Sequence, residues 1–368
     1  MRGPNEIDFW RGFALVTIFI NHIPGIYYER FTFRNVSLSD SAELFVFLAG
    51  WAVRKLTDGK AGALPAKWLV LRLESRAFQV YIAQLAVTEF AVALLAAASL
   101  YLDAPFLLDW HNASAIFNDP VEAQLGLVLL THQLGYFNIL PLYVVLIFLS
   151  PVVVLLHRAS KLLLLLVSLA VYMAALLWGV NLPTWPVEGS WFFNPLSWQL
   201  IYVLGFLFAG ETGPGKYMWG HRRALRFLAL PLVLLGAAIG LTGFSPDSVL
   251  GPDPKLVLSF SKTFLAPARL IHFLSLAMFF AGAFPLIARW LPGIPGYLCL
   301  LGRNSLIVFC ILSLLSLCAQ IFRYVYGGSL TTDSLIAGCG LFFLGFAAWA
   351  GEWRDRMQRE LAGKPLLL

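Results

Sequence analysis

Residues 161–178 read KLLLLLVSLAVYMAALLW, a run of 18 residues whose one charged side chain is Lys161 at its start. An α-helix of this length spans about 27 Å, close to the roughly 30 Å hydrocarbon core of a bilayer. Comparable apolar runs recur along the chain on both sides of this stretch. This repetition predicts an all-α, polytopic integral membrane protein.

The composition favours the same class of protein. Lys and Arg number 26 and Asp and Glu 20 in 368 residues, so 12% of the chain is charged, whereas soluble domains carry about 25%. Apolar residues make up 59% of the chain and the mean hydropathy is +0.77, values that exclude a pair of soluble domains. The net charge of +6 is spread over short loops, so no nucleic-acid partner is expected.

The apolar runs and the residues that break them predict ten membrane-spanning helices. The run 68–100 is long enough to project beyond the bilayer, and 121–136 is predicted as a separate short helix at the membrane interface. We expect one integral-membrane domain over residues 1–352 and a short cytoplasmic tail over 353–368. The ten predicted helices cover residues 9–26, 41–57, 68–100, 137–157, 161–178, 197–210, 224–243, 266–288, 297–322 and 331–352.

Basic residues predict the orientation of these helices. With the N-terminus in the cytoplasm, the ten spans place 20 Lys and Arg residues on the inner side and 6 on the outer side. This asymmetry follows the positive-inside rule and predicts that both termini are cytoplasmic. The basic residues on the outer side are Arg30, Arg34, Lys255, Lys262, Arg269 and Arg323.

Several enzyme classes are excluded because their motifs are absent from the sequence. The chain has no Walker P-loop, no HExxH motif and no GxSxG motif, which argues against ATP hydrolysis, zinc proteolysis and α/β-hydrolase chemistry. The cysteines lie within late apolar runs and form no closely spaced loop framework, so neither disulfides nor a metal site is expected. No bound cofactor is expected either. The four cysteines are Cys299, Cys310, Cys318 and Cys339.

The first predicted helix carries a stripe of polar residues. Arg11 and His22 are eleven residues apart, a rotation of about 1100° that puts them on one face, about 16 Å apart along the axis. Asp8 lies three residues before Arg11, and Asn21 directly precedes His22. Because ionisable groups within a membrane are costly, this stripe suggests catalytic residues. The alternative is an Arg that snorkels to the interface and a His that is hydrogen-bonded between helices.

Glu43 is a further catalytic candidate. It lies at the start of the predicted helix 41–57, which descends from the outer side, and so enters the membrane at about the depth of His22. A carboxylate there would orient the imidazole and raise its basicity. The alternative is a carboxylate that the dipole favours at a helix N-terminus.

The most basic stretch of the chain follows the second predicted helix. Arg72 and Arg76 are one turn apart at the cytoplasmic start of the third helix, and Arg54 and Lys55 precede them. Guanidinium groups offer forked donors suited to phosphate, so these residues are candidates for binding a nucleotide-containing donor. The alternative is topology alone, since basic loops orient membrane helices.

A third group of polar and aromatic residues is predicted near the outer face. His132, Asn138 and the i,i+3 pair Arg269 and His272 would line an acceptor pocket or pair with interfacial water. Trp191, in an aromatic-rich outer loop, would stack on a sugar ring or belong to the interfacial aromatic belt. Asn138, together with Asn21, is also a candidate donor to an oxyanion.

Five segments of the sequence resemble the OpgC family of integral membrane transferases. The most specific is the N-terminal run DFWRGFAL from Asp8 to Leu15, which continues as IFINHIPG from Ile18 to Gly25. The sequence departs from the family pattern at Asn138, where Asp is expected, and at Asn304, where His is frequent. The other four segments are ELFVFLAG at 43–50, GYFNILPLY at 135–143, FNPLSWQ at 193–199 and LGRNSL at 301–306.

This resemblance implies an activity and roles for some residues. Characterised OpgC relatives transfer succinyl groups to osmoregulated periplasmic glucans at the bacterial inner membrane. The family is related to the acyltransferase-three membrane proteins, which share a ten-helix core and a motif of Arg, ten residues and His. The motif matches Arg11 and His22, which implies that His22 is the catalytic histidine. Arg72 and Arg76 match basic residues near the acyl-CoA entrance, and Arg303 is a further donor-binding candidate.

The leading hypothesis is an inner-membrane O-acyltransferase surrounded by lipid. An acyl group, with succinyl as the leading case, would pass from cytoplasmic acyl-CoA to a hydroxyl of a periplasmic glucan, with His22 as general base. The competing class is a secondary transporter or flippase of a small anion or glycan, in which polar residues at the membrane midplane look similar. A non-catalytic membrane scaffold or lipid-binding protein is a third class, and it leaves the polar stripe of the first helix without a purpose.

Overall fold

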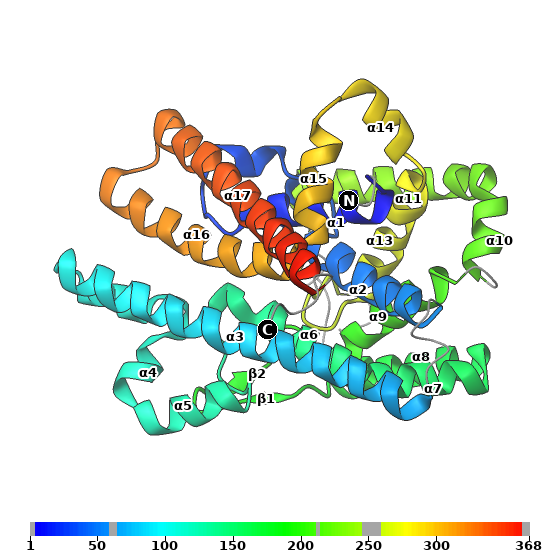
Figure 1. Cartoon of the computed structure of the whole chain (residues 1–368), viewed down its shortest axis with the longest axis horizontal. Helices are drawn as coiled ribbons and strands as arrows, with labels where there is room; N and C mark the ends of the chain where they lie inside the picture. The colour runs from blue at the N-terminus through cyan, green and yellow to red at the C-terminus, as the bar shows by residue number, and fades with distance from the viewer. Residues whose placement is uncertain (1–3, 59–64, 211–213, 245–258, 363–368) are drawn as a thin grey trace. The chain divides into compact units, whose positions relative to one another are not determined.

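The structure is a computed structural model that describes residues 4–58, 65–210, 214–244 and 259–362. Helices form nearly all of its regular structure (Figure 1). The chain divides into two compact units, which we call the terminal unit (Met1–Thr32 with Ala281–Leu368) and the central unit (Phe33–Phe280). A single domain over 1–352 stays a prediction.

The terminal unit brings the start of the chain together with its end. The first helix, α1 (Glu6–Asn21), packs against α15 (Ile294–Arg303) and α16 (Ser305–Tyr326). The long helix α17 (Leu330–Ala362) follows a short turn and packs against α16 (Figure 1). The smaller elements of this unit are η1 (Tyr27–Phe31) and α14 (Phe284–Trp290).

The central unit contains the longest helix, α3, and a two-stranded antiparallel hairpin (Figure 1). Its buried core includes Trp198, Tyr202 and Phe206, all from α9. Its elements are η2 (Phe33–Val36), α2 (Ser41–Asp58), α3 (Ala66–Tyr101), η4 (Pro105–Asn112), α4 (Ser114–Asn118), α5 (Pro120–Val128), η5 (Gly135–Asn138), α6 (Ile139–Phe148), α7 (Ser150–Ala159), α8 (Lys161–Trp178), β1 (Pro183–Thr184), β2 (Gly189–Ser190), α9 (Pro195–Phe208), α10 (Pro214–Gly220), α11 (Arg222–Thr242) and α13 (Pro267–Phe280).

Local sequence signals explain where several helices begin and end. The side chain of Asn5 accepts a hydrogen bond from the Asp8 amide and caps α1, and Ser160 caps α8 in the same way. Both are residue types that favour the N-cap position. Gly179 ends α8 with a φ of 62°, a left-handed conformation that glycine adopts without steric cost. The apolar run 161–178 is therefore one complete helix, as predicted.

Two helix pairs meet through reciprocal glycines. A Cβ atom on Gly12 of α1 would overlap the carbonyl of Leu298 on α15, and one on Gly302 of α15 would overlap the carbonyl of Asp8 on α1. Such contacts bring two helix backbones close together, as small residues do in membrane proteins. In the central unit, α2 and α9 repeat the arrangement with Gly50 against Tyr202 and Gly205 against Phe47.

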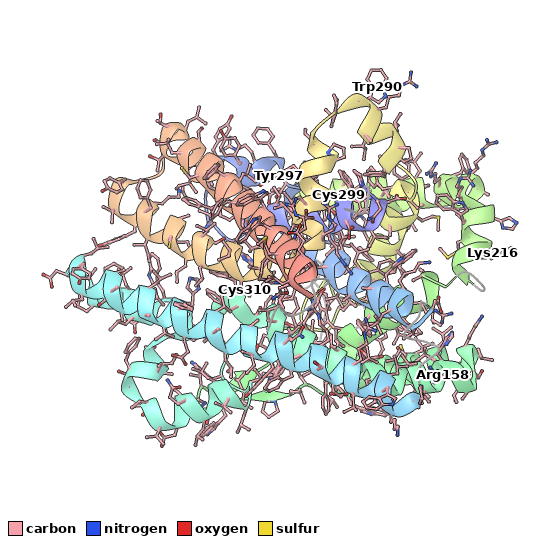
Figure 2. The ribbon with its side chains drawn as sticks, viewed as in Figure 1. Arg158, Lys216, Trp290, Tyr297, Cys299 and Cys310 are labelled. Carbon is pink, nitrogen blue, oxygen red and sulfur yellow. The ribbon has the colours of Figure 1, made fainter. Side chains whose placement is uncertain are left out.

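Side chains on α15 add polar contacts near Gly12 and Gly302, where α1 and α15 meet. The hydroxyl of Tyr297 donates to the carbonyl of Leu341 on α17 at 2.5 Å, and the thiol of Cys299 donates to the carbonyl of Asn5 at 3.4 Å. Figure 2 labels both side chains on this helix. Cys299 is a free thiol, as are the other three cysteines.

Within the described residues, five helices are long and apolar enough to cross a membrane, and there are up to seven if each of two bent helix pairs forms one span. Many large apolar side chains on these helices are exposed. In α11 only Ala229 and Gly236 are buried, whereas Phe227 is 78% exposed. The spans are Ala66–Tyr101, Lys161–Trp178, Arg222–Thr242, Ser305–Tyr326 and Leu330–Gln358, and the pairs are Gly135–Phe148 with Ser150–Ala159 and Pro267–Phe280 with Phe284–Trp290.

Some predicted boundaries differ from those in the structure. α1 ends at Asn21 rather than at residue 26, because Pro24 and the left-handed Gly25 do not continue a helix. The predicted helix 297–322 is divided at Asn304 into α15 and α16. The predicted helix 121–136 is shorter, since α5 ends at Val128 and Leu130 has a positive φ.

The predicted tail continues the preceding helix. α17 extends unbroken through residues 353–362, while residues 363–368 lie outside the described part of the chain. The cytoplasmic location of this segment stays a prediction.

Candidate functional site

The polar stripe predicted on the first helix lies on α1 of the terminal unit. Asp8 is in the first turn, where its carboxylate accepts a hydrogen bond from the Asn5 amide group at 2.6 Å. Arg11 is half-buried within the helix. His22 is the C-cap residue and is also half-buried. The catalytic roles predicted for these residues stay predictions.

The turn after α1 is held by polar contacts within the terminal unit. The side-chain oxygen of Asn21 accepts a hydrogen bond from the Thr32 hydroxyl at 2.7 Å. The backbone carbonyl of His22 accepts one from the Gln320 amide group at 2.6 Å. The side chains of Asn21 and Gln320 thus tie the segment around His22 to Thr32, the residue after η1, and to α16.

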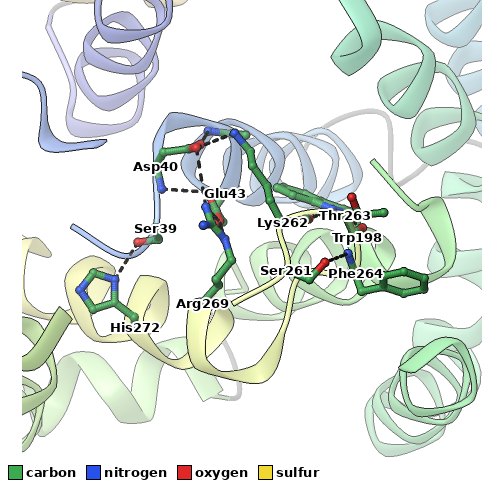
Figure 3. Close-up of polar contacts among 11 residues, drawn as sticks. Ser39, Asp40, Glu43, Trp198, Ser261, Lys262, Thr263, Phe264, Arg269 and His272 are labelled. Atoms are coloured by element: carbon green, nitrogen blue, oxygen red, sulfur yellow. Dashed lines mark hydrogen bonds and ion pairs between the residues drawn. The ribbon is translucent and has the colours of Figure 1, made fainter. Parts of the chain in front are cut away.

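Glu43, the other predicted catalytic carboxylate, is fully buried in the central unit. Its Oε1 accepts a hydrogen bond from Nε of Arg269 at 2.8 Å, and Nη2 of Arg269 lies 2.7 Å from the same oxygen. Its Oε2 accepts a hydrogen bond from the backbone amide of Asp40 at 3.0 Å. Both oxygens of this carboxylate therefore have partners in its own unit (Figure 3). Its predicted action on His22 stays a prediction.

Asp40 extends this arrangement into a four-residue ionic cluster with Glu43, Lys262 and Arg269. Nζ of Lys262 lies 2.5 Å from Oδ2 of Asp40, and Nη2 of Arg269 lies 3.6 Å from it. Burial would raise the pKa of the Asp40 carboxyl, but the charges of Lys262 and Arg269 outweigh burial and hold that pKa well below its usual range. Two carboxylates and two cations balance one another, as buried charges require.

The segment that carries Lys262 is fixed to α9. The indole Nε1 of Trp198 donates to the carbonyls of Lys262 and Thr263 at 3.0 and 3.2 Å. The Thr263 carbonyl also accepts a hydrogen bond from the backbone amide of Asn194 at 3.1 Å. The Lys262 ammonium lies 5.5 Å from the ring centre of Phe193. The backbone contacts of this segment therefore place the lysine beside Asp40 (Figure 3).

His272, the other member of the predicted i,i+3 pair with Arg269, contacts Ser39 of the segment before α2. Its Nδ1 is hydrogen-bonded to the hydroxyl of Ser39 at 2.9 Å, and the ring is buried. A Cβ on Gly236 of α11 would overlap the ring, so α11 and α13 meet closely at this histidine. An acceptor-binding role for Arg269 or His272 stays a prediction.

The predicted donor-binding residues separate into buried and exposed groups. Arg54 is buried, and its guanidinium contacts Asp58 at 2.8 Å, Nε2 of His157 at 2.5 Å and the ring of Phe206, 5.2 Å from its centre. Arg303 forms an ion pair of 2.7 Å with Glu352 in the terminal unit. The exposed candidates in the central unit are Lys55, Arg72 and Arg76.

The remaining acceptor candidates lie in the loops and short helices of the central unit. His132 is buried, and burial lowers the pKa of its imidazole. Asn138 is half-buried directly before α6. Trp191 is only 4% exposed, with its backbone amide donating to the Leu182 carbonyl at 2.9 Å. A stacking role for this indole stays a prediction.

Sequence reasoning did not select Asp40 and Lys262 as site residues, nor Gln320, Arg323 and Asp333. One feature of the sequence marks Lys262 and Arg323 as unusual. Both are basic residues on the predicted outer side, against the positive-inside bias. Each proves to have a carboxylate partner. In these two cases a basic residue that opposes the bias forms an ion pair.

The apolar helices and the ionic groups buried among them define the protein as a polytopic α-helical membrane protein. The family model described as OpgC protein matches residues 4–356. The chain therefore belongs to the OpgC family, which supports a glucan-modifying acyltransferase as its general class. Searches of curated proteins and of solved structures found no match.

Proposed function

We propose that this protein is an O-acyltransferase of the bacterial inner membrane that transfers an acyl group, for which we propose succinyl, from cytoplasmic acyl-CoA to hydroxyls of a periplasmic glucan. The observation that carries the proposal is membership of the OpgC family over residues 4–356. The half-buried His22 at the end of α1 supports it, because acyl transfer to a hydroxyl needs a base.

In the proposed reaction His22 removes the proton from a glucan hydroxyl as its oxygen attacks the thioester carbonyl. The tetrahedral intermediate collapses, the carbon–sulfur bond breaks, and the CoA thiolate leaves and takes up a proton. The product is a glucan ester. Asn21 or Asn138 is the proposed donor to the oxyanion. The Thr32 hydroxyl that bonds to the Asn21 oxygen supports this role for Asn21, because it fixes the orientation of the amide.

Donor binding is proposed at the exposed arginines of α3. Arg72 and Arg76 are one turn apart and both exposed, which suits contact with the phosphates of acyl-CoA. Lys55 is exposed as well and would add a third positive charge. Arg54 and Arg303 already contact carboxylates, so we propose that neither contacts the phosphates directly.

We also propose ten spans with both termini in the cytoplasm. The support is the distribution of 20 basic residues inside and 6 outside, together with a helix or a helix pair at each predicted range. Reporter fusions after Ala159 and after Gly179 test this topology. Activity of a cytoplasmic reporter at the first site and of a periplasmic reporter at the second is expected, and the reverse pattern contradicts it.

The function is tested with the purified full-length protein in lipid nanodiscs. Succinyl-CoA labelled in the acyl group is mixed with a periplasmic glucan, and label in the glucan is measured. Transfer by the wild type and its loss in His22→Ala, at equal amounts of folded protein, is the expected result. No transfer from succinyl-CoA or acetyl-CoA, combined with uptake of labelled glucan or anion into vesicles without acyl-CoA, favours the transporter class.

A further inference from the structure

The end of α1 needs hydrogen-bond donors from outside its own helix. The last carbonyls of any helix have no intrahelical partner, and here Pro24, which has no amide hydrogen, follows two residues after the cap at His22. Away from water, each such carbonyl that stays without a partner is unfavourable. The carbonyls around His22 therefore need donors from another part of the chain.

The donors come from one face of α16. The hydroxyl of Ser316 donates to the carbonyl of Phe19 at 3.3 Å, and the amide group of Gln320 donates to the carbonyl of His22 at 2.6 Å. The guanidinium of Arg323 donates to the carbonyls of the next two residues in the turn, Pro24 and Gly25. Positions 316, 320 and 323 follow the i, i+4, i+7 spacing of a single helix face.

Asp333 holds Arg323 in this position. Its Oδ1 forms an ion pair of 2.9 Å with Nε of Arg323, while its Oδ2 accepts a hydrogen bond from the backbone amide of Tyr27 at 2.7 Å. Asp333 is 3% exposed. A Cβ on Gly328 would overlap the guanidinium, so the space around it is filled. The arginine and the aspartate together fix the turn from both of its sides.

We propose that Gln320 and Arg323 are positioning residues for the imidazole of His22. This inference rests on the proposed function, in which His22 is the base. Gln320 fixes the backbone of His22 itself, and Arg323 fixes the turn that follows. Displacement of a catalytic group by about 1 Å lowers a rate by roughly a hundredfold, so losing these bonds slows the chemical step without weakening substrate binding.

The experiment compares variants in nanodiscs at equal amounts of monodisperse protein. Gln320→Leu removes the donor to His22 while keeping similar volume, and Arg323→Lys keeps the charge beside Asp333 but loses the forked donor. Cys318→Ala is the matched control, because Cys318 is an exposed side chain on the same helix. The readouts are kcat, the KM for acyl-CoA, the KM for glucan and the thermal midpoint.

The expected result is a kcat lowered at least tenfold in Gln320→Leu and less in Arg323→Lys, with both KM values within about twofold of wild type. The control is expected to match wild type. If Gln320→Leu does not fold, Arg323→Lys alone decides the matter. Normal kcat per folded molecule in the variants, with only the thermal midpoint lowered, overturns the positioning role. A wild type without acyl transfer overturns the proposed function and this inference with it.

Discussion

Arg269 and Glu43 are 226 residues apart in sequence and are joined by two close contacts. Nε of Arg269 lies 2.8 Å from Oε1 of Glu43, and Nη2 lies 2.7 Å from the same oxygen. Glu43 is fully buried and Arg269 is 9% exposed. A pair of this kind is neutral as a unit, whereas either member alone would be an uncompensated buried charge. The contact therefore ties the start of α2 to α13.

Removing one member of this pair should destabilise the protein more than removing both. Arg269→Leu is expected to lower the free energy of unfolding by about 3 kcal/mol or more, because it leaves Glu43 unpaired. The double variant Arg269→Leu with Glu43→Leu should regain most of that loss. Denaturation followed by tryptophan fluorescence in detergent measures both. Equal losses in the single and double variants would show that the pair does not act as a unit.

Acid stability should depend on Lys262. Because the Asp40 pKa is lowered in the folded protein, the folded state binds fewer protons than the unfolded state below the ordinary Asp pKa of about 3.9. Stability is thus fully present above that pH and is lost as the pH falls towards the lowered pKa. In Lys262→Met the Asp40 pKa lies closer to its ordinary value, so the variant should be less stable at neutral pH and should lose less stability as the pH falls. Thermal midpoints measured between about pH 7 and 3 test this, and superimposable curves would contradict it.

The glycine contact between α1 and α15 should tolerate no side chain. Gly12→Ala is expected to destabilise the protein by about 1–3 kcal/mol, since overlap with the Leu298 carbonyl forces the helices apart. Gly338→Ala is the control, because nothing lies within 4 Å of a Cβ built there. It should be neutral or slightly stabilising. Equal thermal midpoints for the two variants would rule out the close contact.

The donor proposal predicts a selective effect on acyl-CoA binding. Arg72→Gln and Arg76→Gln should each raise the KM for acyl-CoA about tenfold, the loss expected for a hydrogen bond to a charged group, with kcat unchanged. Lys67→Gln, an exposed residue in the first turn of the same helix, is the control. A KM for acyl-CoA that rises equally in all three variants would indicate a general charge effect instead of a phosphate site.

Helix positions could be predicted from the sequence because the signals are local. Apolar runs, caps such as Ser160 and breakers such as Pro24 act within a few residues. The ion pairs could not be predicted in this way, because Asp40 and Lys262 are 222 residues apart and no local period links them. The same limit applies to Gln320, which bonds to His22 across 298 residues.

The positive-inside count still contained information about these contacts. Of the basic residues placed on the outer side, Lys262, Arg269 and Arg323 each form an ion pair with a carboxylate. Arg30 lies over the ring of Tyr27, 4.3 Å from its centre. Four of the six basic residues predicted on the outer side thus have a carboxylate or an aromatic ring nearby, while Lys255 lies outside the described residues.

We propose that His22 is the base of an acyl transfer to glucan. The most direct measurement is mass spectrometry of periplasmic glucans from a strain that lacks this gene and is complemented with wild type, His22→Ala or Cys318→Ala at equal membrane levels. If His22 is the base, glucans carrying the added mass of succinyl groups are expected with wild type and Cys318→Ala, and unsubstituted glucans with His22→Ala and with no complementation. Identical glucans from all four strains, or full substitution with His22→Ala, would contradict it.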